Sequence, residues 1–343
     1  MKKAAIICTL GPSSRTSAVL EDMTRAGMDV ARVNCSHGSR AQHRLLLSLV
    51  DRLNSGRRKR VKKMLDLQGY RVRVRLPGRR RELVLNQGDA VLLSTAGGAT
   101  GKCALALDYP GSAGDIPVGS LVYVDDGSVA LRVERRRGDF LSARTVVPGT
   151  VREGKGVNIP EANLVFGGLT DRDRADLESG LAAGVDFVAQ SFVREARDML
   201  LLDDFRRKHG LRFKLIAKIE SRQGIQNLDG ILEVCDGIMV ARGDLGVSVP
   251  IFQVPVLQKT IIAKCRDAGR FAITATQMLE SMTERPLPTR AEVSDVANAV
   301  IDGSDYVMLS AETAVGKHPV ETVRMMSQIV RFTEAYLSGR APA

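Results

Sequence analysis

The sequence predicts an α/β protein built as a (β/α)8 barrel with an inserted small β-rich lid domain. Eight apolar runs rich in β-branched residues are mostly separated by segments of helical period that end on glycine, and one interval of short alternating runs interrupts this rhythm. Strand, helix and glycine in repetition are typical of a parallel sheet. Without the interval, about 260 residues remain, close to the ~250 typical of such a barrel.

The eight predicted strands cover residues 4–11, 29–36, 61–69, 186–193, 214–221, 237–244, 270–277 and 305–312. Helical period characterises residues 14–27, 39–56 and 256–269, and each of these segments ends on a glycine suited to a left-handed cap, namely Gly27, Gly56 and Gly269. Periodicity does not show whether the sheet closes, so an open doubly wound sheet remains the alternative architecture.

The segment of short alternating runs divides the predicted barrel into two parts. Residues 1–70 form the first part of the barrel, 71–156 the lid and 157–343 the second part. The lid segment contains alternating runs such as "LVLNQGDAVLLS", which indicate short strands joined by turns. We expect it to fold as a small β-barrel-like domain.

Composition sets the class of protein. With 343 residues, 44% of them hydrophobic, the chain can bury a large core, and it contains no apolar run of membrane-spanning length and no signal peptide. Its five cysteines have no CxxC spacing, so we expect free, mostly buried thiols and a cytoplasmic location.

The net charge of +11 is concentrated in arginine-rich runs at 57–63, 71–81 and 134–137, which suit an anionic partner. The chain has no Trp and only 4% aromatic residues, and this composition argues against specific nucleic-acid binding. Small phosphorylated substrates fit the charge better.

Polar residues gather where the predicted strands end, and in a barrel these ends share one face. They are Arg32, Asn34, Ser36, Asp66, Lys218, Glu220, Asp244, Thr276, Ser310 and Glu312. Alternation along a strand places Lys218 and Glu220 on the same side. Glu220 and Asp244 come from consecutive strands, so their carboxylates suit Mg²⁺ completed by substrate oxygens and water. Gly243 would let backbone N–H groups approach a ligand carboxylate, with Thr276 adding a hydroxyl.

Several motifs together resemble the pyruvate kinase family in order and spacing. They are "CTLGPSS", "MDVARVNCSHG", "YVDDG", "GKGVNIP", "AKIES", "DGIMVARGDLG", "ATQMLESM", "PTRAEVSDVANAVIDG" and "MLSAETAVGKHP". The resemblance is close over residues 1–70 and 155–335 and looser over the lid. It implies a glycolytic phosphotransferase that moves the phosphoryl group of phosphoenolpyruvate to ADP and protonates the enolate to pyruvate.

The resemblance also implies roles for individual residues. Glu220 and Asp244 would bind Mg²⁺ or Mn²⁺, and Lys218 would stabilise the transferring phosphoryl group and the enolate oxygen. The remaining matches are Thr276 and Ser310 on the carboxylate and proton-delivery side with Glu312 nearby, Gly243 at the substrate, Arg32 and Arg73 at phosphate groups, His37 and Lys155 at the nucleotide, and Asn34, Ser36 and Asp66 at K⁺. Phosphoryl transfer needs mainly positioning and charge neutralisation, which this set provides.

Two departures from the family pattern produce further expectations. After Asp66 the family continues Thr-Lys-Gly-Pro-Glu-Ile-Arg, whereas this chain places Arg71 where the family has its glutamate. A fixed cation beside the monovalent site predicts that K⁺ is not required. The C-terminal regulatory domain common in the family is expected to be absent, which predicts a homodimer through a barrel-barrel contact.

Two alternative functions remain at this point. A Mg²⁺-dependent aldolase or lyase of the pyruvate-enolate type also places a Glu and an Asp at strand ends, but Lys218 and the lid argue against it. A catalytically silent barrel that binds nucleic acid through its arginines is the second, and the retained charged residues argue against that function.

Overall fold

The computed structural model describes residues 4–95, 101, 103–166 and 169–339. Eight parallel strands close into a barrel in the order β1-β17-β16-β15-β14-β13-β3-β2. They are β1 (Ala5–Thr9), β2 (Met28–Asn34), β3 (Lys62–Leu67), β13 (Phe187–Gln190), β14 (Lys214–Ile219), β15 (Gly237–Ala241), β16 (Phe271–Ala275) and β17 (Tyr306–Leu309). All eight predicted strands are therefore confirmed, and the pairing of β1 with β17 excludes the open sheet.

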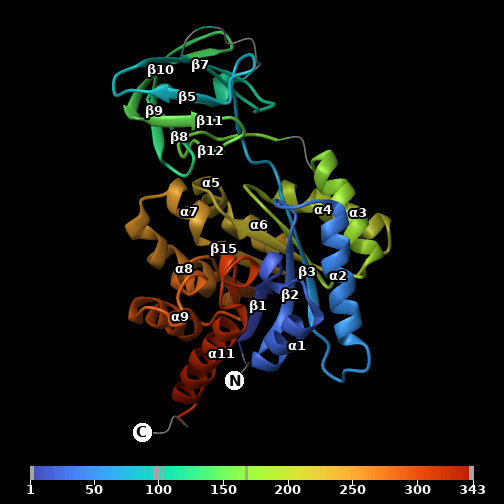
Figure 1. The fold of residues 1–343 in the computed structure, drawn as a ribbon. Coiled ribbons are helices and arrows are strands. Elements are labelled where there is room, and N and C mark those ends of the chain that lie inside the picture. The colour runs from blue at the N-terminus through green and yellow to red at the C-terminus, as the bar shows by residue number, and fades with distance from the viewer. Residues whose placement is uncertain (1–3, 96–100, 102, 167–168, 340–343) are drawn as a thin grey trace.

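Helices surround this TIM barrel, as Figure 1 shows. They are α1 (Ser17–Ala26), α2 (Arg40–Asn54), α3 (Asp171–Ala182), α4 (Ala196–Lys208), α5 (Arg222–Gln226), α6 (Leu228–Val234), α7 (Arg242–Ser248), α8 (Val254–Asp267), α9 (Arg290–Asp302), α10 (Ala311–Ala314) and α11 (Pro319–Leu337). The glycines predicted to end α1, α2 and α8 all have positive φ. No helix within the described residues is long and apolar enough to span a membrane.

The barrel buries two kinds of core. Side chains such as Ile7, Met64, Ile216 and Met239 form a cluster contributed by the strands alone. Larger clusters lie between the strands and the surrounding helices. Apolar side chains cover most of both faces of the barrel strands and make the barrel a rigid scaffold for its polar rim.

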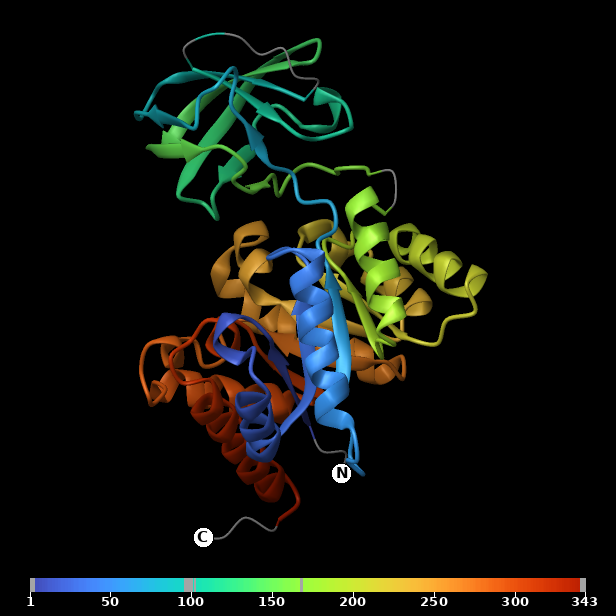
Figure 2. The same ribbon diagram turned by 45° about the vertical axis from the view of Figure 1, so that its right-hand side comes forward.

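The insertion forms a separate β-rich lid above the carboxyl ends of the barrel strands (Figures 1 and 2). A seven-stranded sheet contains β4 (Val74–Arg75), β6 (Ala90–Ser94), β7 (Ala104–Leu107), β8 (Leu121–Val124), β9 (Val129–Arg137), β10 (Phe140–Val147) and β12 (Val157–Asn158), while β5 (Glu82–Leu85) pairs with β11 (Gly149–Arg152). The lid core begins at Val72 and includes Leu164, so it extends past the expected boundary at Gly156.

Gly69 occupies the point where the chain leaves β3 for the lid. Its φ is +66°, and a Cβ there would lie 2.4 Å from the carbonyl oxygen of Ser191. Its N–H donates to Asp173 Oδ1 at 3.1 Å. Only glycine fits this turn without strain, which fixes where the lid departs from the barrel.

Candidate active site

A buried ion network links the carboxyl ends of β2, β3 and β14. Arg32 donates through Nε to Asp66 Oδ2 at 2.7 Å and through Nη1 to Thr9 Oγ1 at 2.7 Å. Lys218 Nζ lies 3.1 Å from Asp66 Oδ1 and 3.2 Å from Glu220 Oε1. All four charged side chains are buried. The prediction that Lys218 and Glu220 share a side is confirmed.

The network controls the ionisation of its members. Burial alone would raise the pKa of Asp66, but Lys218 and Arg32 lower it below its usual value. Burial would lower the pKa of Lys218, but Asp66 and Glu220 raise it above its usual value. Asp66 is therefore a carboxylate and Lys218 an ammonium at neutral pH.

Glu220 and Asp244 are close enough to interact electrostatically. Burial raises the pKa of Glu220, and the charge of Asp244 raises it further, although Lys218 opposes both. Two carboxylates in this relation are stabilised by a cation between them, and hard oxygen donors are what Mg²⁺ prefers. The donor set fits a divalent ion.

Asp244 differs from its prediction in one respect. β15 ends at Ala241, and Asp244 lies in the first turn of α7 rather than on the strand. Its ion-pair partner is Arg71 of the lid, whose Nη2 lies 3.2 Å from Asp244 Oδ1 and also 2.8 Å from Asp126 Oδ1. A cavity of about 1010 Å³ opens beside these residues and continues along α8 and α9, although Lys218 and Glu220 do not line it.

The Gly243 N–H does not point to an open ligand site as predicted. It donates to Thr276 Oγ1 at 2.9 Å, and the same hydroxyl donates to Ala275 O at 2.6 Å. Thr276 has a φ of +67°, which is uncommon for a β-branched residue. Arg242 holds this turn by donating to the carbonyl of Thr276 at 2.6 Å. Strained backbone kept in place in this way is typical of functional sites.

Ser310 follows β17, the strand next to β16, and its buried hydroxyl has no hydrogen-bond partner within the described residues. Glu312 is fully buried, and its carboxylate accepts from the backbone N–H groups of Leu279 and Ser310 at 3.2 and 2.6 Å. Burial raises the pKa of Glu312 despite these bonds. An unsatisfied hydroxyl beside a carboxyl of raised pKa is consistent with a proton-delivery role.

The residues predicted to bind nucleotide lie where the lid joins the barrel. Partial burial lowers the pKa of His37, and the charges of Arg32, Arg73 and Arg71 lower it further. Arg73 Nη1 donates to Gly154 O at 2.9 Å. Lys155 Nζ contacts Asp125 Oδ1 at 2.9 Å.

The predicted K⁺ ligands have other partners in this structure. Both oxygens of Asp66 accept from cationic side chains. Asn34 Oδ1 accepts from the backbone N–H of Ser36 at 3.1 Å. A monovalent cation at Asp66 would therefore meet Arg32 and Lys218.

The sequence analysis did not identify three residues that hold the site residues in place, namely Ser191, Phe192 and Arg242. The Ser191 hydroxyl accepts from Lys218 Nζ at 2.6 Å and donates to Leu67 O at 2.7 Å. The backbone N–H of Phe192, a residue with φ of +55°, donates to Glu220 Oε2 at 2.6 Å. Ser191 and Phe192 follow β13 at the same edge as the other site residues, and this position was the available signal. Arg242 stands beside Gly243 in a motif already noted.

Comparison with known proteins agrees with this geometry. The protein-family model described as "Pyruvate kinase, barrel domain" matches residues 1–323 of this chain. The chain is 41% identical to the pyruvate kinase of Clostridium perfringens over 98% of this chain and 71% of that protein, and 41% identical to that of Geobacillus stearothermophilus over 99% and 58%. The pyruvate kinase of Thermococcus litoralis is 41% identical over 97% and 70%. The chain thus spans between 58% and 71% of the lengths of these relatives. From its barrel, its site and these matches, the chain belongs to the pyruvate kinase family.

Proposed function

We propose that this protein transfers the phosphoryl group of phosphoenolpyruvate to ADP, giving pyruvate and ATP. The observation that carries the proposal is the buried network of Arg32, Asp66, Lys218 and Glu220 at the barrel mouth, with Asp244 close by and the lid above it. The network supplies fixed charges where an anionic substrate would bind. It supports phosphoryl transfer better than the aldolase or silent-barrel alternatives.

Each residue has a distinct task in this proposal. A divalent ion held by Glu220 and Asp244 would neutralise the substrate carboxylate and phosphate. Asp66 orients Arg32 and Lys218, and the guanidinium of Arg32 keeps N–H groups without a partner among the described residues for a phosphate oxygen. Lys218 donates hydrogen bonds to Asp66 and Ser191 and forms an ion pair with Glu220, so its ammonium is held in place at the barrel mouth.

The remaining polar groups serve the two ends of the reaction. Thr276 would contact the substrate carboxylate, and the hydrogen bonds that fix its turn support this role. Ser310 would deliver the proton that converts the enolate to pyruvate, and the Glu312 carboxylate that accepts from its backbone N–H supports this role. His37, Arg73 and Lys155 would contact ADP from the junction of lid and barrel. A closed lid would exclude water and limit hydrolysis.

The test is pyruvate formation from phosphoenolpyruvate and ADP, with and without Mg²⁺. We expect activity that requires the metal and falls by at least ~100-fold in Glu220→Gln, because one charged ligand is lost. Glu233→Gln on α6 is the matched control, since Glu233 is exposed and its variant should keep full activity. Absence of pyruvate from the wild-type protein would refute the proposal.

The proposal includes independence from K⁺. Arg71 places a fixed positive charge 3.2 Å from Asp244, and both oxygens of Asp66 are already paired with cations. The Arg71 guanidinium would repel a K⁺ bound several ångströms away in a partly buried site. Coulomb's law at an intermediate dielectric gives a repulsion of roughly a few kcal/mol. The guanidinium would itself supply the charge that K⁺ otherwise brings.

We also propose a homodimer formed between barrels. Ile251 and Phe252, in the short turn before α8, are each 76% exposed, and Val256 in the first turn of α8 is 65% exposed. Large apolar side chains that gather in this way mark interaction surfaces. A second copy of the chain is the partner that this face fits.

A further inference from the structure

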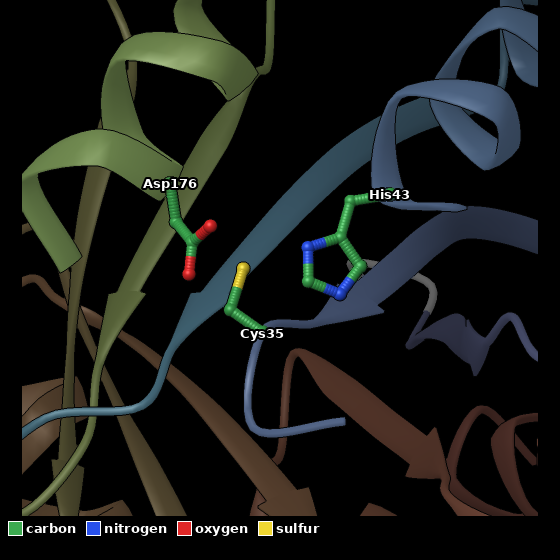
Figure 3. Close-up of side chains that lie close together, drawn as sticks. All are labelled: Cys35, His43 and Asp176. Atoms are coloured by element: carbon green, nitrogen blue, oxygen red, sulfur yellow. The ribbon is translucent and has the colours of Figure 1, made fainter. Parts of the chain in front are cut away.

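A second group of potential metal ligands lies apart from Glu220 and Asp244. Within the described ranges, Cys35, His43 and Asp176 are the one group of three such residues whose ligand atoms all lie within 4.8 Å of one another. All three side chains are buried, with 0%, 5% and 3% exposure. Figure 3 shows the carboxylate and the imidazole on opposite sides of the Cys35 sulfur. The residues come from the loop after β2, from α2 and from α3.

The hydrogen bonding of this cluster is incomplete. His43 Nδ1 and Asp176 Oδ2 are buried and have no hydrogen-bond partner in the part of the chain that the structure describes. His43 Nε2 lies 2.7 Å from the carbonyl oxygen of His37. A carbonyl only accepts, so Nε2 carries the proton, and in the neutral ring Nδ1 presents a lone pair. The cluster therefore directs a nitrogen lone pair, a carboxylate oxygen and a sulfur at one another.

Two half-exposed arginines, Arg40 and Arg172, form long ion pairs with Asp176. Hydrogen-bond acceptors that face one another in a buried site destabilise the fold unless a donor or a cation lies between them. The guanidinium groups of Arg40 and Arg172 approach Asp176 only to 3.5 and 3.7 Å, and both are about half exposed. Neither makes a hydrogen bond to Asp176 Oδ2.

We propose that Cys35, His43 and Asp176 bind one thiophilic divalent cation of the Zn²⁺ class, with water as the fourth ligand. Sulfur, imidazole nitrogen and carboxylate oxygen are the ligands that Zn²⁺ takes, whereas Mg²⁺ takes oxygen alone. The bond from His43 Nε2–H to a backbone carbonyl is the support that a metal-ligating histidine usually has. Binding would release the thiol proton to solvent and leave thiolate, carboxylate and cation with no net charge.

The position of the site gives it a consequence. Arg172, beside Asp176, donates to the carbonyl of Cys35 at 2.8 Å, so the loop is already tied to α3. A bound ion would join this loop, α2 and α3 directly. Because Asn34, Ser36 and His37 flank Cys35, the ion would stiffen one rim of the proposed active site.

The experiment uses the full chain in a thiol-free reductant. Saturating Mg²⁺ is added to occupy the proposed site at Glu220 and Asp244. Metal binding is measured by the absorption spectrum of added Co²⁺ and by competition for Zn²⁺ with a chromophoric chelator. We expect about one Co²⁺ per chain with a thiolate-to-cobalt charge-transfer band. Cys35→Ala should lose the band, whereas Cys103→Ser on the lid should keep it. Asp176→Asn should keep the band and bind Zn²⁺ at least about tenfold more weakly.

Each result decides the proposal without an activity measurement. Absence of the band from the wild-type protein would overturn it. Persistence of the band in folded Cys35→Ala would also overturn it, because another cysteine would then be the ligand. Unchanged Zn²⁺ affinity in Asp176→Asn would exclude the carboxylate as a ligand.

Discussion

Replacing Asp66 by Asn tests the energetic role of the buried network. Asp66 has no exposed surface, and its carboxylate contacts Arg32 at 2.7 Å and Lys218 at 3.1 Å. In the variant, Lys218 keeps Glu220, but Arg32 loses its one acidic partner among the described residues and retains the Thr9 hydroxyl. Breaking a buried pair in this way costs about 3–5 kcal/mol. We expect the free energy of unfolding to fall by that amount at pH 7.

The effect has a defined pH dependence. The folded pKa of Asp66 lies below the ordinary value of 3.8, so its contribution is complete above that value and is lost as the pH falls through the folded pKa. The difference in unfolding free energy between wild type and Asp66→Asn should therefore stay constant from roughly pH 5 upward and shrink below roughly pH 4.

Urea unfolding followed by far-ultraviolet circular dichroism measures this difference, because the chain has no Trp for fluorescence. Asp229→Asn is the control, since Asp229 is 78% exposed in its ion pair with Lys264 and should change the free energy by less than about 1 kcal/mol. If Asp66→Asn loses no more than this control, the network does not stabilise the fold as reasoned.

Three other changes test the proposed function and assembly. Lys218→Met should slow pyruvate formation by at least ~100-fold without unfolding the chain, because the buried positive charge beside the phosphoryl group is lost. Wild-type turnover in this variant would refute the proposed role of Lys218. The initial rate of the wild-type protein in a tetraalkylammonium buffer should change by less than about tenfold when KCl is added at constant ionic strength. The rate of Arg71→Glu should become dependent on K⁺. A larger rise in the wild-type rate would reject K⁺ independence. Phe252→Asp should convert a dimer to a monomer by light scattering, while Val84→Asp on the lid should not; an unchanged dimer would place the interface elsewhere.

The approximate positions of the eight strands were predictable from sequence because they depend on local properties. β-Branched apolar runs, helical period and glycines with positive φ act within a few residues of one another, and they identified all eight strands and the glycines that end three helices, although the strand predicted to reach Asp244 ends at Ala241. The charged rim was predictable for a related reason. Parallel strands bring their carboxyl ends to one face, so residues such as Lys218 and Glu220 had to meet.

Tertiary structure decided what depends on contacts between distant segments. Barrel closure rests on the pairing of β1 with β17, which no local pattern encodes. Gly243 gives its N–H to Thr276, Ser191 completes the contacts of Lys218, and Cys35 meets Asp176 of a helix far along the chain. A side chain's partners are set by the packing of the whole barrel, whereas the sequence states only which groups are available to be packed.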